Sequence, residues 1–175
     1  MANNCDFGMK VKGIKSNVEA FVRAMQWEGE YAEQGVGRIY YCDVIESNAQ
    51  DDNVWVFDLC GDCAWSIWTA MRNAENPNNI EALSKRLNLM IEVISEEPGV
   101  GFMEHFAIDN GEILCDDCID WTSICIDEIE DDEEEFWENY GAELAKEGIT
   151  RDNYMDYVVD DYINIGGIEW DYDFI

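Results

Sequence analysis

Two Cys-x-x-Cys pairs are the residues of this chain whose type and spacing could do chemistry: Cys60-Gly61-Asp62-Cys63 and Cys115-Asp116-Asp117-Cys118. Four thiolates form a tetrahedral ligand set for structural zinc. However, 51 residues separate the pairs, whereas zinc sites of this kind place them about 15–20 apart. The second pair also lies in a predicted strand, where positions three apart face opposite sides. We therefore expect buried free thiols and no metal; the alternative is zinc held by Cys60, Cys63, Cys115 and Cys118.

The other reactive residue types do not form a catalytic constellation. His105 is the single histidine and follows Glu104 in a predicted strand, with no serine or cysteine placed as a nucleophile beside it. Adjacent carboxylates such as Glu96 and Glu97 arise by chance in a chain with 40 acidic residues. The sequence 109–111 (Asp-Asn-Gly) lacks the upstream oxygen ligands of a calcium-binding loop. We therefore predict that the protein is not an enzyme and takes no cofactor.

The chain is strongly acidic. Its 175 residues carry 40 Asp plus Glu against 10 Lys plus Arg, a formal net charge of -30. Charge on this scale opposes compaction, but disorder is expected only when hydrophobicity is also low. Apolar residues make up 47% of the chain, with seven Trp, eight Tyr and seven Phe. We therefore expect a single folded domain spanning residues 1–175, with the excess charge on its surface.

The composition also restricts the partners and the compartment. An acidic surface repels nucleic acid phosphates and anionic lipids, so we expect neither nucleic acid nor a membrane as a direct partner. No apolar run approaches the roughly 18–20 residues of a membrane span, and the N-terminus carries no export signal. Seven cysteines without such a signal favour a reducing compartment. The prediction is a cytoplasmic protein with a basic protein partner; homodimer formation is left open.

The elements that must position these residues follow from periodicity and turn residues. A period-two pattern predicts a first strand at 6–13, and helical spacing predicts a helix at 18–25 capped by Ser16 or Asn17. Asn110-Gly111 predicts a tight hairpin between strands 102–108 and 112–121. The other predicted elements are strands 38–45, 54–59 and 89–95 and helices 64–72 and 80–87. This order indicates an α+β fold, a largely antiparallel sheet with helices on one face.

About half of the charge lies near the C-terminus, where residues 127 to 175 hold 18 acidic and 2 basic side chains. The acid run 126–135 suits the start of a helix, which Gly148 should end. A further helix capped by Asp152 and a final strand at 168–174 are predicted after it. Residues 126–175 are thus expected to form an acidic, largely helical elaboration of a core at 1–125. We assign Phe136, Tyr140 and Trp170 to the hydrophobic core and leave Trp137 and Tyr157 open.

Four segments carry a resemblance to a known family: MANNCDFGMKVKG, CGDCAWSIWTAM, IEVISEEPGVGFMEHFAIDNGEIL and GGIEWDYDFI. Together they resemble the YubB ferredoxin-like family of mobile-element proteins, over residues 1 to about 125 and the last segment. The resemblance implies a ferredoxin-like core without an iron-sulfur cluster, and carriage on plasmids, phages or other mobile DNA. It implies no active site. In physical character, though not in motif, the chain is also similar to acidic anti-CRISPR and anti-restriction proteins that imitate nucleic acid.

The charge itself is the main candidate for function. Duplex DNA carries about one negative charge per 1.7 Å of axis, so about thirty carboxylates match on the order of fifteen base pairs. Helical spacings of three and four project several carboxylates to one side. The predicted partner-binding residues are Asp131, Asp132, Glu133, Glu134, Glu135, Glu138, Asp156, Asp160 and Asp161. The hypothesis is an anti-defence protein that occupies the basic nucleic-acid-binding cleft of a Cas effector or a restriction enzyme.

Other readings of the same residues stay open. The acid run could be a solvated face, although the net charge far exceeds the magnitude of about 2–8 that solubility needs. The protein could be a non-enzymatic ferredoxin-like module that binds another protein and whose acidity is incidental. A metal-dependent hydrolase that uses Asp and Glu is the third alternative. A change of charge in the run at 131–135 separates the nucleic-acid mimic from the binding module, and uptake of divalent metal tests the hydrolase.

Overall fold

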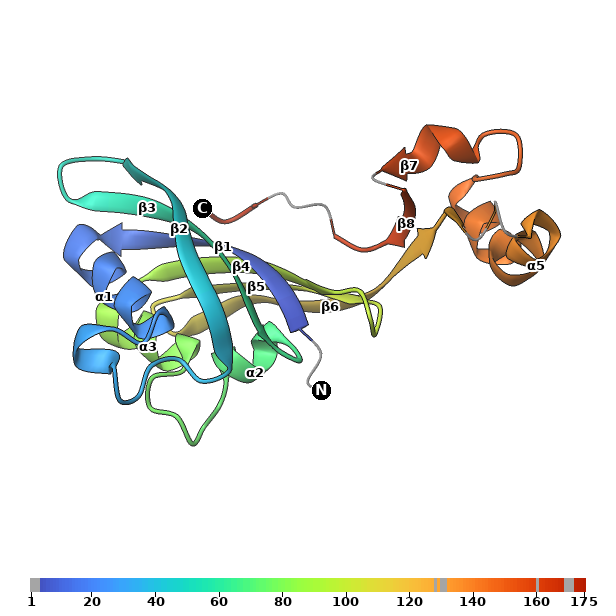
Figure 1. Ribbon diagram of the computed structural model, residues 1–175. Helices are drawn as coiled ribbons and strands as arrows, with labels where there is room; N and C mark the ends of the chain where they lie inside the picture. The colour runs from blue at the N-terminus through green and yellow to red at the C-terminus, as the bar shows by residue number, and fades with distance from the viewer. Residues whose placement is uncertain (1–3, 128, 130–131, 160, 169–171) are drawn as a thin grey trace.

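The chain folds into a curled antiparallel sheet of eight strands with helices against it, an α+β architecture (Figure 1). The computed structural model describes residues 4–127, 129, 132–159, 161–168 and 172–175. The strands are β1 (Asn4–Ile14), β2 (Ile39–Ala49), β3 (Val54–Ala64), β4 (Met90–Glu97), β5 (Phe102–Asp109), β6 (Glu112–Cys125), β7 (Val158–Val159) and β8 (Tyr162–Gly166). The helices are α1 (Lys15–Met25), α2 (Ile67–Met71), α3 (Ile80–Leu87) and α5 (Glu133–Leu144), with the 3-10 helices η1 (Gly29–Tyr31), η2 (Ala145–Glu147) and η3 (Tyr154–Tyr157). Within the described ranges, no helix is long and apolar enough to cross a membrane.

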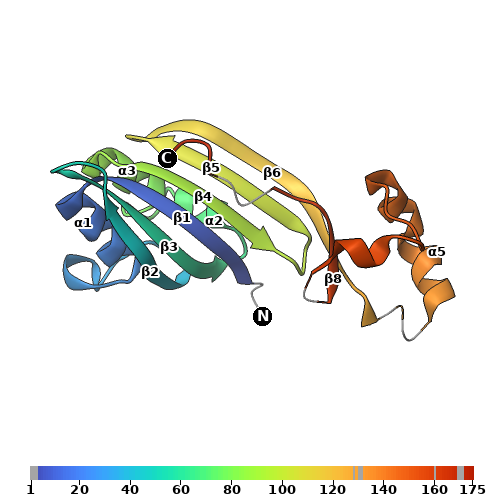
Figure 2. The same cartoon turned by 90° about the horizontal axis from the view of Figure 1, so that it is seen from above.

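The strand order is β2-β3-β1-β4-β5-β6-β8-β7, and each neighbouring pair is antiparallel. β1 lies between β3 and β4 and alternates as its sequence predicts, because Phe7, Met9 and Val11 are all buried on one face. Helices α1, α2 and α3 cover that face and complete the main hydrophobic core (Figures 1 and 2). No helix of the described residues lies on the opposite side of β1–β6, and we call that side the open face.

The predicted hairpins are confirmed. β2 and β3 pair antiparallel along their length, and β5 and β6 pair through the Asn-Gly turn. Asn110 (φ 49°) and Gly111 (φ 81°) both lie in the left-handed region that a two-residue hairpin turn requires. Helix α3 begins where predicted, with the Asn79 side chain accepting a hydrogen bond from the Ala82 amide at 2.8 Å. These local signals therefore placed much of the main sheet correctly.

β6 is long enough to join two parts of the molecule. Its first nine residues pair with β5, and its last five (121–125) pair with β8. Residues 121–166, as far as they are described, form a C-terminal lobe that projects from the main sheet (Figure 1). The lobe has a small core of its own: Ile124, Phe136, Leu144, Ile149, Ile163 and Ile165.

Two predicted elements of the C-terminal region differ from what the described residues show. The helix expected after Asp152 is the short η3 followed by β7 and β8. Asn153 explains the difference, because its side chain bonds Thr150 N at 2.6 Å and Gly148 O at 3.0 Å, which favours a turn over a helix start. The final strand expected at 168–174 is absent from its described residues, and 169–171 lie outside them. There the amides of Asp173 and Phe174 bond a side chain, Glu92, instead of a neighbouring strand.

The predicted N-cap of the first helix is also wrong. Helix α1 begins at Lys15, and Ile14 at its N-cap makes no side-chain hydrogen bond. Asn17 lies inside the helix, and its side-chain amide donates to Leu87 O at 2.7 Å, joining α1 to the end of α3. The helix expected at 64–72 is the shorter α2, capped by Ser66, because β3 continues to Ala64. Tertiary contacts decided these boundaries over local preference.

Candidate functional site

Helix α5 carries most of the carboxylates that were predicted to bind a partner. Asp132 is its N-cap and accepts a hydrogen bond from the Glu135 amide at 3.1 Å. Glu133, Glu134 and Glu135 occupy the first turn, where the helix dipole favours negative charge. These four residues and Glu138 are exposed. The sequence thus folds locally into a helix whose start is a dense group of solvated carboxylates.

Arg151 partly neutralises this group. Its Nη1 lies 2.8 Å from Glu134 Oε1 and its Nη2 lies 3.1 Å from Oε2, a bidentate pair, and Glu133 Oε1 lies 3.6 Å from Nη1. The hydrogen bond from Arg151 lowers the pKa of the Glu134 carboxyl below its ordinary value. The guanidinium also lies over the Trp137 ring, 5.7 Å from its centroid. Arg151 therefore holds the residues after α5 against the acidic start of that helix.

The remaining predicted carboxylates lie on other elements of the lobe. Asp156 lies in η3 and is exposed. Asp161 lies between β7 and β8 with φ 69°, and its carbonyl oxygen accepts a hydrogen bond from Ile126 N at 3.0 Å. Asp131 and Asp160 lie outside the described residues. The lobe thus brings α5 and η3 together through the contact between Trp137 and Tyr154, whose ring centroids are 5.9 Å apart.

The aromatic residues of the lobe divide between core and surface. Phe136 is 2% exposed, and Tyr140 packs against the same core, so the core assignment of both is confirmed. Trp137, left open by the sequence, is half-buried against that core, whereas Tyr157 is 45% exposed. Trp170 lies outside the described residues.

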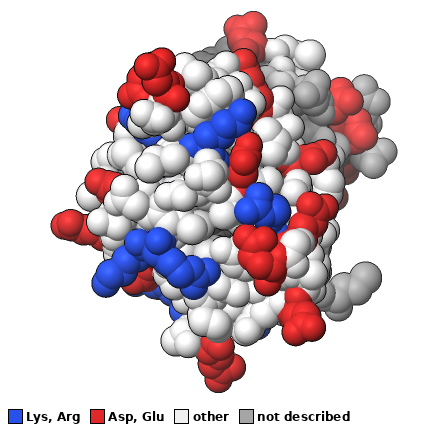
Figure 3. All heavy atoms as spheres, turned by 90° about the vertical axis from the view of Figure 1, so that its left-hand side faces the viewer, with Lys and Arg blue, Asp and Glu red and all other residues white. Residues whose placement is uncertain are grey.

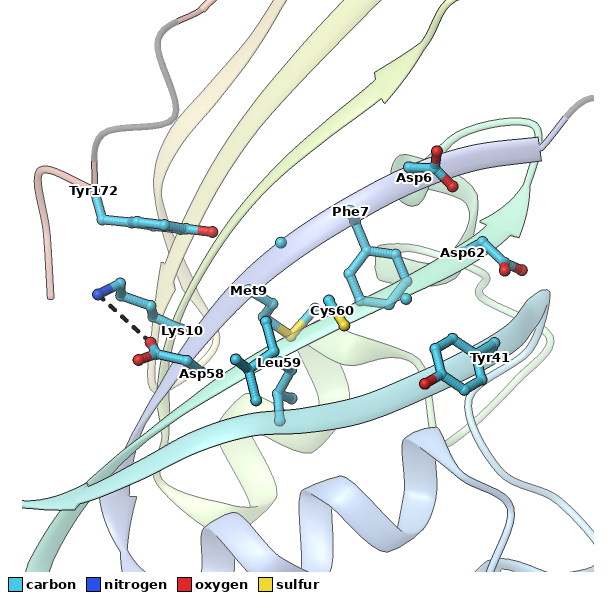
Figure 4. Close-up of a pocket in the computed structure, with 13 residues that line it drawn as sticks. Asp6, Phe7, Met9, Lys10, Tyr41, Asp58, Leu59, Cys60, Asp62 and Tyr172 are labelled. Atoms are coloured by element: carbon cyan, nitrogen blue, oxygen red, sulfur yellow. Dashed lines mark ion pairs between the residues drawn. The ribbon is translucent and has the colours of Figure 1, made fainter. Parts of the chain in front are cut away.

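Sequence reasoning missed a pocket on the open face, with a volume of about 640 Å³ (Figure 4). It lies over β1 and β3, between β2 and the C-terminal tail (the described residues after β8). Its polar rim consists of Asp6, Asp58, Asp62, Lys10, Tyr41 and Tyr172. The available signal was the spacing of Asp58 and Asp62, which are four residues apart and therefore lie on the same face of a strand, but the chain alone did not show that Tyr172 returns to this place.

Electrostatics in the pocket favour a cation. Asp6 and Asp62 are direct partners in the β1–β3 register, and like charges in that position destabilise a sheet. Burial, followed by repulsion from Asp6, raises the pKa of the Asp62 carboxyl. Asp58 Oδ1 is buried without a hydrogen bond, although Lys10 Nζ forms an ion pair with it at 3.5 Å. A positively charged side chain with an apolar stem would relieve the repulsion between Asp6 and Asp62.

The C-terminal tail forms one side of the pocket. Lys10 Nζ lies 5.0 Å from the centroid of the Tyr172 ring, a cation-π contact. Burial, followed by the negative charges of Asp58 and Glu92, raises the pKa of the Tyr172 hydroxyl to about 12. Tyr172 therefore stays a neutral hydrogen-bond donor well above neutral pH.

The two Cys-x-x-Cys pairs do not come together. Cys60 and Cys63 lie in β3, with Cys63 buried in the main core and Cys60 beside the open-face pocket. Cys115 and Cys118 lie in β6, which β1, β4 and β5 separate from β3. Four strand spacings of about 4.8 Å place the pairs about 19 Å apart, too far for shared zinc. The four thiols are free, as are those of Cys5, Cys42 and Cys125.

In the described part of the chain, one group of side chains could hold a metal ion. It consists of His105, Cys115 and Asp117, whose ligand atoms all lie within 4.8 Å of one another. Burial, followed by the hydrogen bond with Asp117, raises the pKa of the Cys115 thiol to about 11. His105 was expected to be an ordinary strand residue, and its pairing with Cys115 could not be found from the sequence spacing.

No family model, curated protein or solved structure matches this chain. The resemblance to the YubB ferredoxin-like family therefore stays a prediction.

Proposed function

We propose that this protein binds the basic nucleic-acid-binding cleft of a bacterial defence nuclease and blocks it by imitating the charge of nucleic acid. The observation that carries the proposal is the exposed acidic start of α5, in a lobe where Lys146 and Arg151 are the basic residues of the described part. A charge of -30 on a folded chain is a strong source of attraction to a cationic cleft. The target class is a Cas effector or a restriction enzyme.

The distribution of charge along the molecule supports this proposal. The lobe projects from the end of β6, away from the helices of the main sheet (Figure 1). Lys and Arg side chains appear among Asp and Glu on the opposite end, which carries α1 and α3 (Figure 3). Eight of the ten basic residues precede residue 126. An approaching cationic surface is therefore steered toward the C-terminal lobe and not toward the end that carries α1 and α3, where both signs of charge occur.

The proposal includes a ferredoxin-like core. The first part of the chain follows the order strand-helix-strand-strand-helix-strand. These elements are β1, α1, β2, β3, α2 with α3, and β4. Their sheet order, β2-β3-β1-β4, keeps β1 and β3 in the centre. This order supports the fold that the family resemblance implies, and β5, β6 and the lobe are then additions at one edge.

A charge-neutralising variant of α5 tests the proposal. We expect the protein to inhibit DNA cleavage by a purified guide-loaded Cas9 or a restriction enzyme, with an inhibitory concentration that rises as more DNA is added. The variant Glu133→Gln, Glu135→Gln, Glu138→Gln should weaken inhibition at least tenfold, because it removes three exposed charges from the proposed contact. The effect should shrink as salt rises, since the screening length falls from about 10 Å at 0.1 M to about 3 Å at 1 M.

The matched control removes the same amount of charge from the part of the protein that precedes the C-terminal lobe. It is the variant Glu28→Gln, Glu33→Gln, Glu75→Gln, and all three positions are exposed. It should inhibit nearly as well as the natural sequence. Equal losses in both variants would show that only net charge matters. Inhibition that is independent of DNA concentration and unaffected by the α5 variant would rule out nucleic-acid mimicry.

The open-face pocket favours a second candidate function, a protein-binding module whose overall acidity is incidental. Asp62, Tyr41 and Tyr172 place one carboxylate and two aromatic rings around an apolar floor, a setting that suits an arginine side chain. In that case Asp62→Asn with Tyr172→Phe should abolish partner binding, while the α5 variant leaves it intact. The two functions therefore predict opposite results from the same pair of variants.

A further inference from the structure

Strand pairing places three different metal-ligand types on one patch of the open face. His105 on β5 lies opposite Asp117 on β6, and Cys115 precedes Asp117 by two residues, on the same side of the strand. A register irregularity between Ala107 and Ile108 falls next to Cys115. Such bulges redirect side chains in a strand. The pairing of β5 with β6 therefore brings an imidazole, a thiol and a carboxylate together.

The distances from the Cys115 sulfur to the other two groups are close to those around a single tetrahedral ion. Cys115 Sγ lies 3.7 Å from His105 Nδ1 and 3.2 Å from Asp117 Oδ2. In a tetrahedral zinc site, with Zn–S about 2.3 Å and Zn–N or Zn–O about 2.0–2.1 Å, sulfur lies about 3.5 Å from the other ligands. Three ligands can therefore reach one ion with small side-chain adjustments.

Glu92 holds the histidine in the form that a metal requires. His105 Nε2 lies 2.8 Å from Glu92 Oε1. The same oxygen accepts the amide of Asp173 at 2.9 Å, and Oε2 accepts the amide of Phe174 at 3.0 Å. Because both carboxylate oxygens act as acceptors, Nε2 must donate. In the neutral ring, Nδ1 then presents its lone pair toward Cys115.

This arrangement of a carboxylate behind a histidine is the usual outer shell of a zinc ligand. Glu92 is fully buried, so its position is fixed by packing as well as by hydrogen bonds. His105 is 8% exposed, whereas Asp117 is exposed and leaves an approach from solvent. The Phe174 ring covers the histidine, with the two ring centroids 6.0 Å apart. The site is thus enclosed around His105 and Glu92 and accessible to solvent at Asp117.

We propose that His105, Cys115 and Asp117 bind a Zn²⁺ ion. A nitrogen, a sulfur and an oxygen ligand suit zinc, whereas Mg²⁺ and Ca²⁺ prefer oxygen alone. On binding, the Cys115 thiol releases its proton to solvent and the thiolate bonds the metal. Three protein ligands leave a fourth position for water. The ion would cross-link β5 to β6 and, through Glu92, steady the C-terminal tail. This site is independent of the nuclease-binding proposal.

Metal titration of the full-length reduced protein tests this site. After treatment with a chelator, the protein should take up one zinc ion per chain in competition with a chromophoric chelator. Co²⁺ in its place should give a sulfur-to-cobalt charge-transfer band. Changes in the outer shell of zinc sites cost about 10–100-fold in affinity, so loss of a ligand in Cys115→Ser should cost at least as much. That variant should also lose the cobalt band.

Two further variants separate a specific site from general attraction to acidic groups. Asp117→Asn should weaken zinc binding and keep the cobalt band, since Asp117 is exposed and the thiolate remains. Cys118→Ser changes an exposed cysteine in the same strand and should bind zinc like the natural sequence. Zinc uptake that is unchanged in Cys115→Ser and Asp117→Asn, or lost in Cys118→Ser, would overturn the proposal. So would a cobalt complex without a thiolate band.

Discussion

Glu92 joins the C-terminal tail to the sheet by hydrogen bonds. This one fully buried carboxylate accepts hydrogen bonds from two tail amides and lies 2.8 Å from the ring nitrogen of His105, so it joins the tail to β5. A lost hydrogen bond to a charged group costs about 1.5–3 kcal/mol. The Glu92 side chain therefore helps to set the position of the tail, the edge of the open-face pocket and the orientation of His105.

Tyr172 provides a prediction about pH at the residue scale. Its pKa is raised to about 12 by burial and by Asp58 and Glu92, whereas an unfolded tyrosine titrates near pH 10. The stability due to Tyr172 should therefore be complete below about pH 10 and be lost as the pH rises toward 12. Urea unfolding at pH 9, 10 and 11 should show a steeper decline for the natural sequence than for Tyr172→Phe. Parallel declines would contradict this prediction.

At the scale of elements, α5 depends on one aromatic side chain. Phe136 is 2% exposed and contacts the rings of Trp137 and Tyr140, at centroid distances of 5.4 Å and 5.2 Å. Phe136→Ala should destabilise the C-terminal lobe by about 3–5 kcal/mol. Hydrogen exchange should then show loss of protection in α5 and β8, with β1 and β4 unchanged, since they belong to the separate main core.

The control for this variant is Leu114→Ala, which truncates a β6 side chain that is 44% exposed. It should change the free energy of unfolding by about 0.5 kcal/mol or less. If Phe136→Ala reduced protection equally in the main sheet, the two cores would form one cooperative unit, and the lobe could not be treated as a separate element.

The prediction of elements succeeded where the determining contacts are short in sequence. Asn110-Gly111 specifies a turn by its own backbone preferences, and the alternation of Phe7, Met9 and Val11 specifies a strand face. It failed after Asp152 and near the C-terminus. After Asp152 the outcome depends on the Asn153 turn, a local side-chain contact that periodicity does not describe, and near the C-terminus it depends on Glu92, which lies 81 residues from Asp173. Periodicity carries no information about such distant partners.

For the whole molecule, the unbalanced charge should appear in the salt dependence of stability. The described ion pairs involve few of the 40 acidic residues, so most of the repulsion within the folded state is uncompensated. Raising NaCl from 0.01 M to 1 M shortens the screening length from about 30 Å to about 3 Å. The melting temperature followed by circular dichroism should therefore rise over this range.

Sodium chloride is the suitable salt for this measurement, because sulfate and phosphate stabilise proteins by exclusion from the surface whatever the charge. Sucrose at matched osmolality controls for exclusion by the added solute. A melting temperature that stays constant or falls with NaCl would show that the acidic groups are compensated in the fold, and it would weaken the case for charge as the basis of function.

The candidate sites differ in how far they could be anticipated. The acidic residues of α5 were predicted by position, because the acid run, the Asp132 cap and the following apolar spacing are all local. The open-face pocket was not, because it needs β1 beside β3 and Tyr172 beside Lys10. The spacing of the two Cys-x-x-Cys pairs disfavours shared zinc but leaves it as an alternative, and the structure excludes it because three strands separate the pairs.

The sequence by itself determined that this protein is acidic, that it folds, and where most strands of its main sheet begin. These properties depend on composition, on periods of two and 3.6 residues and on turn residues, all of which act over a few positions. Only the tertiary structure decided that His105 meets Cys115 and Asp117, that Glu92 holds the tail, and that the lobe has its own core. Strand order and register bring these residues together, and both depend on contacts between segments that the chain keeps far apart.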